Sequence, residues 1–458
     1  MTQRRSRLAL LLLILGLYGR TPSHAQTVSV LYSFYGNGGS GTPFYVVPEQ
    51  GRDSRLYGTT YGPSGSAGSA FAITTAGFER QIYTFGSDGS NPASGPTLAT
   101  DGNLYGTTYD GGAQNLGVLY RLSPSGVYTV LHDFLGDTDG ANPIASPIEA
   151  SDGNLYGATL GVGGASTVYK YSFDGSFSTL FTFEQSQGQY VVGSLTEATD
   201  GSLYGAAEQG GSGTCGSLFQ MSKSGTLLWN YGFSCNVGYL PASSLILASD
   251  GNLYGTTARG GVGIGCGTVF RVDQKRSVTP VYAFKNATDG CEPFGLTQAN
   301  DDSLYGTTAF GGKGKNGGGG TIFKLSLDGV HTKLFDFDGR GEQPYAAPLQ
   351  DTDGKFYGTT SVGGRAGYGS VYSLDMGLGP FATFVLPTGK VGQSAQILGQ
   401  ALTGTTSVTF NGIPATSFAV VKDTYMTAVV PAGATTGPVV VTTPGGKLTS
   451  NVNFRIIK

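Results

Sequence analysis

Histidine is nearly absent from this chain. The sequence has three histidines, and only His132 and His331 lie beyond the N-terminal segment. A Ser-His-Asp triad and a His-rich metal centre both depend on this residue type. Each of the two histidines falls in or at the start of a predicted strand, so we expect strand residues here and no catalytic base or metal ligand.

Charge is scarce as well, at 12 % of residues. The first 25 residues hold four arginines and no acidic residue, which leaves 23 basic and 30 acidic residues and a net charge of −7 for the remainder. Nucleic-acid binding depends on clustered Lys and Arg. This balance argues against a nucleic-acid partner.

Long apolar runs are confined to the N-terminus. Arg4, Arg5 and Arg7 precede the apolar run 8–17, and Ser23-His24-Ala25 follows. This order is typical of a secretory signal peptide. We therefore expect residues 1–25 to be a signal peptide cleaved near Ala25, a secreted chain in the extracellular space or cell envelope, and no membrane span after it.

Nucleotide-binding and nucleophile motifs are missing too. No Walker loop, Rossmann fingerprint or nucleophile elbow stands between a predicted strand and a predicted helix. We expect no cofactor and no metal, and carboxylates remain the only plausible catalytic groups.

What the chain has instead is a repeat. The string Asp101 to Thr108, DGNLYGTT, recurs with its tyrosine at intervals of 48 to 52 residues. The seven copies place that tyrosine at Tyr57, Tyr105, Tyr156, Tyr204, Tyr254, Tyr305 and Tyr357. Such a period is typical of supersecondary units that bury their apolar faces only against their neighbours.

Each repeat contains four short runs of β-branched and aromatic residues separated by Gly, Asp, Asn or Ser, and no helical period. Four strands in about 50 residues predict one blade of a β-propeller. The run 28–34 precedes the first repeat, whereas the last repeat stops after its third strand at Leu374. We predict an all-β, seven-bladed propeller (26–378) in which the N-terminal strand completes the last blade and closes the ring.

Three residue types recur within the repeat. We expect the aspartate four residues before each tyrosine to shape a tight turn. We expect the glycine after each tyrosine to admit a neighbouring aromatic side chain, and the tyrosines to pack between blades.

The pattern as a whole, with DGNLYGTT, a glycine-rich loop and Gly267 to Arg271 (GTVFR), resembles the GloVer tandem-repeat family of secreted and surface-attached bacterial proteins. The resemblance covers about residues 27–378. It implies the repeat architecture and supplies no catalytic residues.

After a linker at 379–386 the composition turns to Val, Thr and Pro. Residues 387–458, with Val408 to Gly412 (VTFNG) and Thr443 to Gly446 (TPGG), resemble the IPT/TIG immunoglobulin-like module. Short alternating strands bounded by Gly and Pro also suit a small β-sandwich directly. In exported proteins the resemblance implies a spacer or a contact surface.

The four cysteines all lie in the fourth and fifth repeats of a chain that we expect to be exported, where disulfides persist. Cys215 and Cys266 fall between the second and third strands, and Cys235 and Cys291 follow the fourth strand. In a blade these two loops share a face, so we predict the disulfides Cys215–Cys235 and Cys266–Cys291.

That face also carries the candidate site. Most repeats begin their innermost strand with a small or aliphatic residue, such as Ala93, Ile144, Val192 and Ala242, whereas three repeats that neighbour one another in a closed ring carry aromatic side chains. We expect an arc at the channel mouth with acidic and basic neighbours, made by Phe44, Tyr45, Phe294, Tyr345, Arg340, Glu342 and Glu292. The alternative is that these aromatics only plug the channel or pack near the ring closure.

The sequence favours a secreted noncatalytic binding or scaffold protein for an extracellular glycan or protein. One alternative is a carbohydrate-active enzyme, a hydrolase or lyase, that uses carboxylates on this face, from among Glu184, Glu208, Glu292 and Glu342. The other alternative is a purely structural envelope protein.

Overall fold

The computed structural model describes residues 26–36, 41–62, 66–136, 138–161, 165–235, 238–261, 265–285, 288–313, 318–339 and 341–457. Every regular element in these ranges is a β-strand, which confirms the all-β prediction. Within the same ranges no helix is long and apolar enough to cross a membrane. The predicted signal peptide and Arg340 lie outside the described residues.

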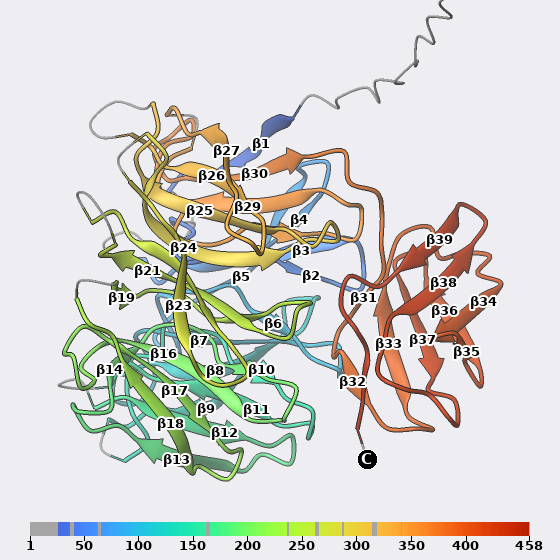
Figure 1. Cartoon of the computed structure of the whole chain (residues 1–458), viewed down its shortest axis with the longest axis horizontal. Helices are drawn as coiled ribbons and strands as arrows, with labels where there is room; N and C mark the ends of the chain where they lie inside the picture. Colours follow the sequence, from blue (N-terminus) through green and yellow to red (C-terminus); the bar gives the residue numbers. More distant parts are fainter. Residues whose placement is uncertain are drawn as a thin grey trace, which may run out of the picture.

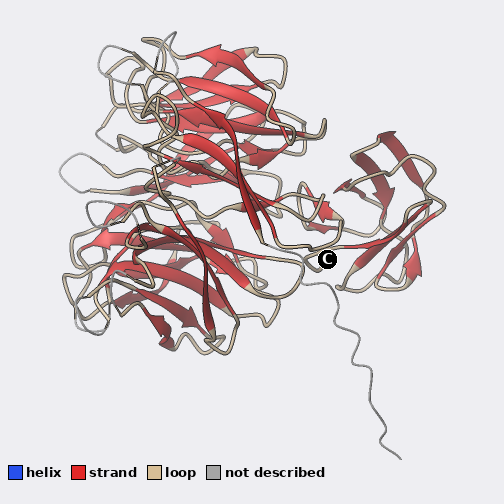
Figure 2. Ribbon diagram, turned by 90° about the horizontal axis from the view of Figure 1, so that it is seen from above, coloured by secondary structure: helices blue, strands red, loops and turns tan. Residues whose placement is uncertain are grey.

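The repeats form seven antiparallel sheets over the described residues, with strands in chain order across the first six and the N-terminal strand at the edge of the seventh (Figures 1 and 2). The first three sheets are β2 (Glu49–Gln50), β3 (Arg55–Thr60), β4 (Ser69–Thr74), β5 (Glu79–Thr84); β6 (Thr97–Leu98), β7 (Leu104–Thr108), β8 (Val118–Leu122), β9 (Tyr128–Asp133); and β10 (Ile148–Glu149), β11 (Leu155–Ala158), β12 (Thr167–Tyr171), β13 (Phe177–Thr182).

In the fourth and fifth sheets the innermost strand is broken into two short pieces. These sheets are β14 (Gln189–Val191), β15 (Thr196–Glu197), β16 (Leu203–Gln209), β17 (Ser217–Met221), β18 (Leu227–Gly232); and β19 (Tyr239–Pro241), β20 (Ile246–Leu247), β21 (Leu253–Arg259), β22 (Thr268–Val272), β23 (Val278–Ala283).

In the sixth sheet the innermost strand runs unbroken. It consists of β24 (Cys291–Gln298), β25 (Leu304–Phe310), β26 (Thr321–Leu325) and β27 (His331–Asp336), and the seventh sheet of β28 (Leu349–Gln350), β29 (Phe356–Thr360), β30 (Ser370–Asp375) and β1 (Thr27–Ser33).

The outermost strand of the seventh sheet comes from the N-terminus. β1 pairs antiparallel with β30, and Val28 lies opposite Leu374. This is the pairing that the sequence predicts. The seventh sheet also contacts the first, because Thr359 Oγ1 donates a hydrogen bond to the Val46 carbonyl at 2.7 Å.

The repeated tyrosine is buried in every copy, and its contacts explain the motif. Tyr57 packs against Leu104 and Tyr120 of the next repeat, which is the predicted packing between units. In six copies the tyrosine hydroxyl donates to the aspartate four residues earlier, as Tyr105 does to Asp101 Oδ2 at 2.8 Å. The aspartate therefore fixes the tyrosine as well as shaping the turn.

The glycine after each tyrosine lies under the aromatic side chain of the third strand. A Cβ on Gly106 would stand 2.3 Å from Tyr120 Oη, and Gly58 has the same relation to Phe71. No residue larger than glycine fits there without moving the ring, so the predicted close approach is confirmed.

Side chains at the end of the innermost strands bind successive sheets together. In five repeats a Gln or Glu accepts a hydrogen bond from the backbone N–H of the preceding sheet, as Gln350 Oε1 does from Asn300. The series continues from the seventh sheet to the first, where Gln50 Oε1 accepts from Thr352 N–H at 3.2 Å.

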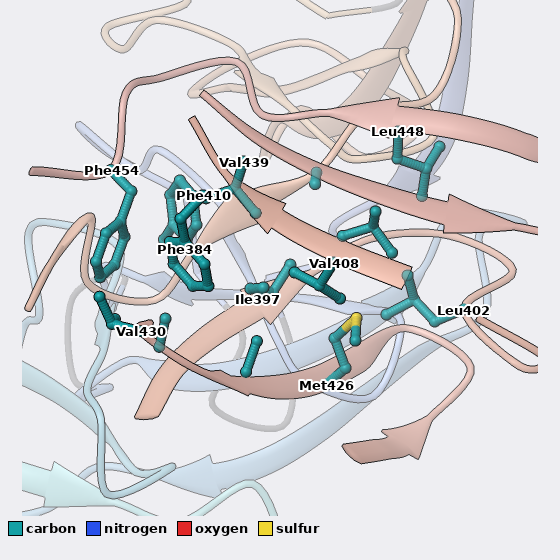
Figure 3. Close-up of a cluster of buried hydrophobic side chains, with 14 of the residues drawn as sticks. Phe384, Ile397, Leu402, Val408, Phe410, Met426, Val430, Val439, Leu448 and Phe454 are labelled. Carbon is teal, nitrogen blue, oxygen red and sulfur yellow. The ribbon is translucent and has the colours of Figure 1, made fainter. Parts of the chain in front are cut away.

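The C-terminal residues form two four-stranded sheets and one two-stranded sheet around a separate core, with Phe384, Phe410 and Phe454 in mutual ring contact (Figure 3). The sheets are β31 (Thr383–Phe384), β33 (Ser394–Leu398), β37 (Tyr425–Val429), β36 (Phe418–Lys422); β35 (Ile413–Pro414), β34 (Ser407–Phe410), β38 (Val439–Thr443), β39 (Gly446–Thr449); and β32 (Thr388–Gly389) with β40 (Arg455–Ile456).

This C-terminal unit packs on the face of the repeats that carries the Asp-Gly turns (Figure 1). Arg52 lies over the Tyr425 ring at 4.7 Å. Gln400 Nε2 donates to Thr352 Oγ1 at 2.9 Å, and Arg455 donates to Glu197 Oε1 at 2.7 Å. The first, fourth and seventh repeats thus share one interface with the C-terminal unit.

Both predicted disulfides are confirmed. Cys215 pairs with Cys235 and Cys266 with Cys291, with Cα–Cα distances of 5.4 and 4.4 Å. One detail of the prediction is wrong, because Cys291 begins β24 of the sixth sheet. The second disulfide therefore joins two adjacent sheets, whereas the first lies within one.

Candidate functional site

A cavity of about 1210 Å³ lies where the innermost strands of the repeats meet. Every repeat contributes to its wall, with Ala93, Ile144, Val192 and Ala242 where the sequence predicts small or aliphatic residues. The cavity extends from the ends of the second strands, at Tyr61 and Arg259, down to Glu49 near the turn face.

Aromatic rings gather on one side of this cavity. Phe44 contacts Tyr45 and Tyr345, with ring centroids 4.5 and 5.0 Å apart. Phe294 lies 5.8 Å from Tyr45 and 5.1 Å from Tyr345. The structure therefore brings together the four aromatic residues of the predicted arc, which we call the aromatic cluster.

Two of the repeats that supply rings to the aromatic cluster differ from the second repeat in the length of the innermost stretch. Five residues separate Pro92 from Leu98 in the second repeat, but six separate Pro43 from Gln50 in the first and four separate Pro293 from Gln298 in the sixth. In the sixth repeat β24 runs through the shorter stretch as one strand, with a register shift between Phe294 and Leu296. Both changes occur in repeats that supply aromatic side chains to the cluster.

Tyr45 has an uncommon backbone conformation, with φ of 53°. A bulky residue in the left-handed region costs free energy and persists only where its surroundings hold it there. Here the ring is held among Phe294, Leu240 and Tyr345. Burial, together with the charges of Glu208 and Glu292, raises the pKa of the Tyr45 hydroxyl to about 12.

The same cavity wall carries Glu208, Glu292 and Arg259. Arg259 forms an ion pair with Glu292, whose side chain is 15 % exposed. Burial raises the pKa of Glu292, and the Arg259 charge partly offsets this. Burial also raises the pKa of Glu208, which has no ion-pair partner among the described residues.

Glu49 is a third carboxyl group in the cavity. It occupies a position that holds Thr97 and Thr297 in two other repeats. Burial raises its pKa to about 8, although a backbone hydrogen bond from Leu98 lowers it in part. Glu49 was not among the predicted site residues. It could have been found as the one acidic residue at a repeat position that otherwise holds Thr, Ile or Leu.

Other predicted site residues lie elsewhere. Glu342 is outside the cavity wall, where its backbone forms two hydrogen bonds with Val362. Its side chain lies beside Gly319, on a loop adjacent to the predicted arc, and its part in ligand binding stays a prediction. Glu184 is exposed and also outside the cavity, and Arg340 lies outside the described residues.

Both histidines lie on outermost strands, outside the cavity wall. His132 stacks on Phe177 and its Nε2 lies 2.9 Å from Asp139 Oδ2. His331 stacks on Tyr282, and burial lowers its pKa. The described residues also contain no group of three or more His, Cys, Asp or Glu arranged to hold a metal ion. The described residues of the cavity wall offer carboxyl groups, one guanidinium, one amide, hydroxyls and aromatic faces.

Comparison with known proteins identifies the repeat. The family model described as the Gloeobacter/Verrucomicrobia repeat matches residues 16–205 and 146–372. No curated protein matches the chain.

Solved structures show a similar fold. One described as streptogramin B lyase has a TM-score of 0.55 and 14 % identity, over 76 % of this chain and 97 % of that one. The extracellular domain of a protein described as a hybrid two-component system from B. thetaiotaomicron has a TM-score of 0.50 and 8 % identity, over 94 % of this chain and 57 % of that one. At these identities the likeness extends only to a β-propeller-like repeat fold.

Proposed function

From the premise that the chain belongs to the Gloeobacter/Verrucomicrobia repeat family, we propose that it is a secreted, noncatalytic binding protein that holds an extracellular glycan in its central cavity. The two disulfides are consistent with an extracellular protein. Residues 1–25 serve as the signal peptide in this proposal.

The observation that carries the proposal is the aromatic cluster. Four rings in mutual proximity lie in a cavity whose wall also includes small residues such as Ala93 and Ser94 and the tyrosines Tyr109 and Tyr190. Aromatic faces beside a few polar groups suit the apolar faces of sugar rings. The left-handed backbone of Tyr45 supports the same conclusion, since strain of this kind gathers at functional sites.

The proposal includes a closed architecture. We infer that the seven sheets form a seven-bladed ring, on the basis of the β1–β30 pairing and the contacts from Gln50 to Thr352 and from Thr359 to Val46. We infer further that the C-terminal unit is an immunoglobulin-like module of the IPT/TIG kind, a spacer or contact surface fixed to the turn face.

A glycan array followed by isothermal titration calorimetry tests the function. The purified chain should bind at least one class of oligosaccharide without releasing product, and Tyr45→Ala should weaken that binding about tenfold or more. Phe78→Ser is the matched control, because Phe78 is 77 % exposed in the turn between β4 and β5. Equal glycan affinity in wild type and Tyr45→Ala would show that the glycan does not bind in the cavity.

A carbohydrate-active enzyme is the second candidate. The observation in its favour is that Glu208 and Glu292 both lie close enough to Tyr45 to raise its pKa, so two carboxyl groups share one part of the cavity. Two carboxyl groups flanking a sugar bond are what most glycosidases use. Product release from a bound glycan, abolished by Glu208→Gln or Glu292→Gln, would establish this function and displace the noncatalytic one. A purely structural envelope protein would show neither binding nor turnover.

A further inference from the structure

The described wall of the cavity holds more carboxyl groups than basic groups. Three of its described wall residues are acidic, Glu49, Glu208 and Glu292, whereas Arg259 is the single basic residue among them. Because Arg259 is paired with Glu292, the carboxyl groups of Glu49 and Glu208 have no cationic partner on the wall. An anionic ligand would meet repulsion here.

These two carboxyl groups are also sheltered from water. Burial raises the pKa of both, since a carboxylate loses hydration without gaining a counter-charge. Burying an unpaired charge is costly, and a bound cation would offset that cost. The cavity is therefore complementary to a ligand that brings positive charge.

The aromatic cluster adds a second attraction for a cation. Glu208 and Glu292 act on the Tyr45 hydroxyl, so the carboxyl groups and the aromatic rings face the same space. The faces of Tyr rings attract ammonium groups, and the same faces pack against sugar rings. The wall also includes Ser94 and Ser146, whose hydroxyls lie 2.9 Å apart and hydrogen-bond each other.

From this combination we propose that the cavity binds a glycan with free amino groups, whose ammonium groups lie against Glu208 and Glu49 while its sugar rings pack on the aromatic cluster. This inference rests on the proposed glycan-binding function and specifies its ligand class. It selects deacetylated amino sugars over their N-acetylated forms, since acetylation removes the charge and leaves the ring.

The test compares two probes that differ in this respect alone. Calorimetry at mildly acidic pH, where the amines are charged, should give an affinity for a glucosamine tetramer about tenfold or more above that for an N-acetylglucosamine tetramer. Glu208→Gln should reduce the glucosamine affinity about tenfold and leave any N-acetylglucosamine binding unchanged. Glu184→Gln is the matched control, because Glu184 lies in the loop between β13 and β14 and is exposed and outside the cavity.

Each other outcome has a distinct meaning. Equal or tighter binding of the N-acetylated tetramer would overturn the ammonium inference and leave the glycan-binding function standing. Equal competition by spermidine would overturn the sugar part, because only the charge would then be recognised. Binding of neither tetramer, with an empty glycan array, would overturn the proposed function as well. Circular dichroism of each variant establishes whether it is folded. If Glu208→Gln does not fold, Glu49→Gln provides a second cavity variant.

Discussion

Gln50 and Thr352 lie 302 residues apart in the chain, yet Gln50 Nε2 donates a hydrogen bond to Thr352 Oγ1 at 2.6 Å. Gln50 Oε1 accepts one in return from the Thr352 backbone at 3.2 Å. The pair thus links the first sheet to the seventh by a hydrogen bond from a backbone N–H to a Gln or Glu side chain. The same kind of hydrogen bond links the second sheet to the third, from Thr100 to Glu149. Together with the β1–β30 pairing it explains why the two ends of the repeat region depend on each other.

Deletion of residues 26–34 should therefore destabilise the whole repeat region. Without β1, the backbone groups of β30 form an exposed sheet edge, which promotes aggregation. We expect a lower midpoint of thermal unfolding and the loss of a monodisperse peak in size-exclusion chromatography.

Val30→Thr is the control for this deletion. Val30 lies on β1 with a side chain that is 41 % exposed, so this change keeps the strand and should leave both measurements unchanged. A monodisperse deletion variant with the wild-type midpoint would contradict the role given to β1.

Two tyrosines of the second repeat should respond in opposite ways to the loss of a hydroxyl. Tyr105 donates to Asp101, so Tyr105→Phe should lower the free energy of unfolding by about 1 kcal/mol. The Tyr120 hydroxyl is buried without a hydrogen-bond partner, and four other repeats carry Phe at that position. Tyr120→Phe should raise the free energy of unfolding by about 1 kcal/mol, since it removes a buried unsatisfied group.

Urea unfolding of both variants measures this contrast. The same gain is expected for Tyr169→Phe and Tyr372→Phe, whose hydroxyls are also buried and unsatisfied. Destabilisation by all three changes would mean that these hydroxyls have a partner, such as an ordered water molecule.

Much of the fold follows from local pattern in the sequence. The strand runs and the glycine under the third-strand aromatic recur in all seven repeats, so seven copies support each inference. The cysteine pairs were inferred from two repeats, through the face that their loops share. The bond between Tyr105 and Asp101 was not predicted, because a turn-forming aspartate and a hydrogen-bonding aspartate look alike in sequence. Cys291 was assigned to the wrong sheet because the innermost strand was expected to begin at Phe294. β24 begins at Cys291 instead, the position at which β14 and β19 begin in the two preceding sheets.

Reduction of the disulfides should cost stability. Cys215–Cys235 closes a loop over a separation of 20 residues, and loop-closure entropy assigns such a bridge about 3 kcal/mol. A Cys215→Ser, Cys235→Ser double variant should have a correspondingly lower free energy of unfolding in urea. Dithiothreitol should lower the unfolding midpoint of the wild type and have no effect on a variant with all four cysteines replaced by Ser.

Stability should depend on pH through Glu49. Burial raises its pKa from 4.5 to about 8, so between these pH values the folded state holds a proton that the unfolded chain releases. The free energy of unfolding should therefore fall as pH rises through this window and be insensitive to Glu49 at lower pH. Buried Asp351, with its pKa raised by burial to about 7, should add to the same trend.

Glu49→Gln should flatten this dependence, as measured by urea unfolding at a series of pH values. Glu184→Gln, at an exposed position, should retain the wild-type slope. An unchanged slope in Glu49→Gln would contradict the buried carboxyl group that holds a proton at neutral pH.

The candidate site was only partly predictable. The four residues of the aromatic cluster could be predicted, because they stand at repeat positions where most other repeats hold small or aliphatic residues. Such positions can be compared from the sequence alone. The direction of the Glu342 side chain could not be predicted, because it depends on packing of the loop before Pro344, which the repeat period does not encode. The left-handed conformation of Tyr45 could not be foreseen, since tyrosine has no preference for it.

The contact between Arg52 and the C-terminal unit leads to the last prediction. Arg52 lies over the Tyr425 ring and donates to the Thr100 carbonyl at 2.7 Å, so one side chain joins the first repeat, the second repeat and the C-terminal unit. Arg52→Ala should lower the free energy of unfolding by about 2 kcal/mol, since it removes a charged hydrogen bond and a cation–π contact together. Hydrogen exchange at residues 423–427 should rise with it. Arg55→Ala is the control, because Arg55 lies in the same turn but is 45 % exposed and pairs only with Asp53 among the described residues. If exchange at 423–427 is unchanged in Arg52→Ala, the C-terminal unit is held by its other contacts, of which the Arg455–Glu197 ion pair is the strongest candidate because Glu197 is only 9 % exposed.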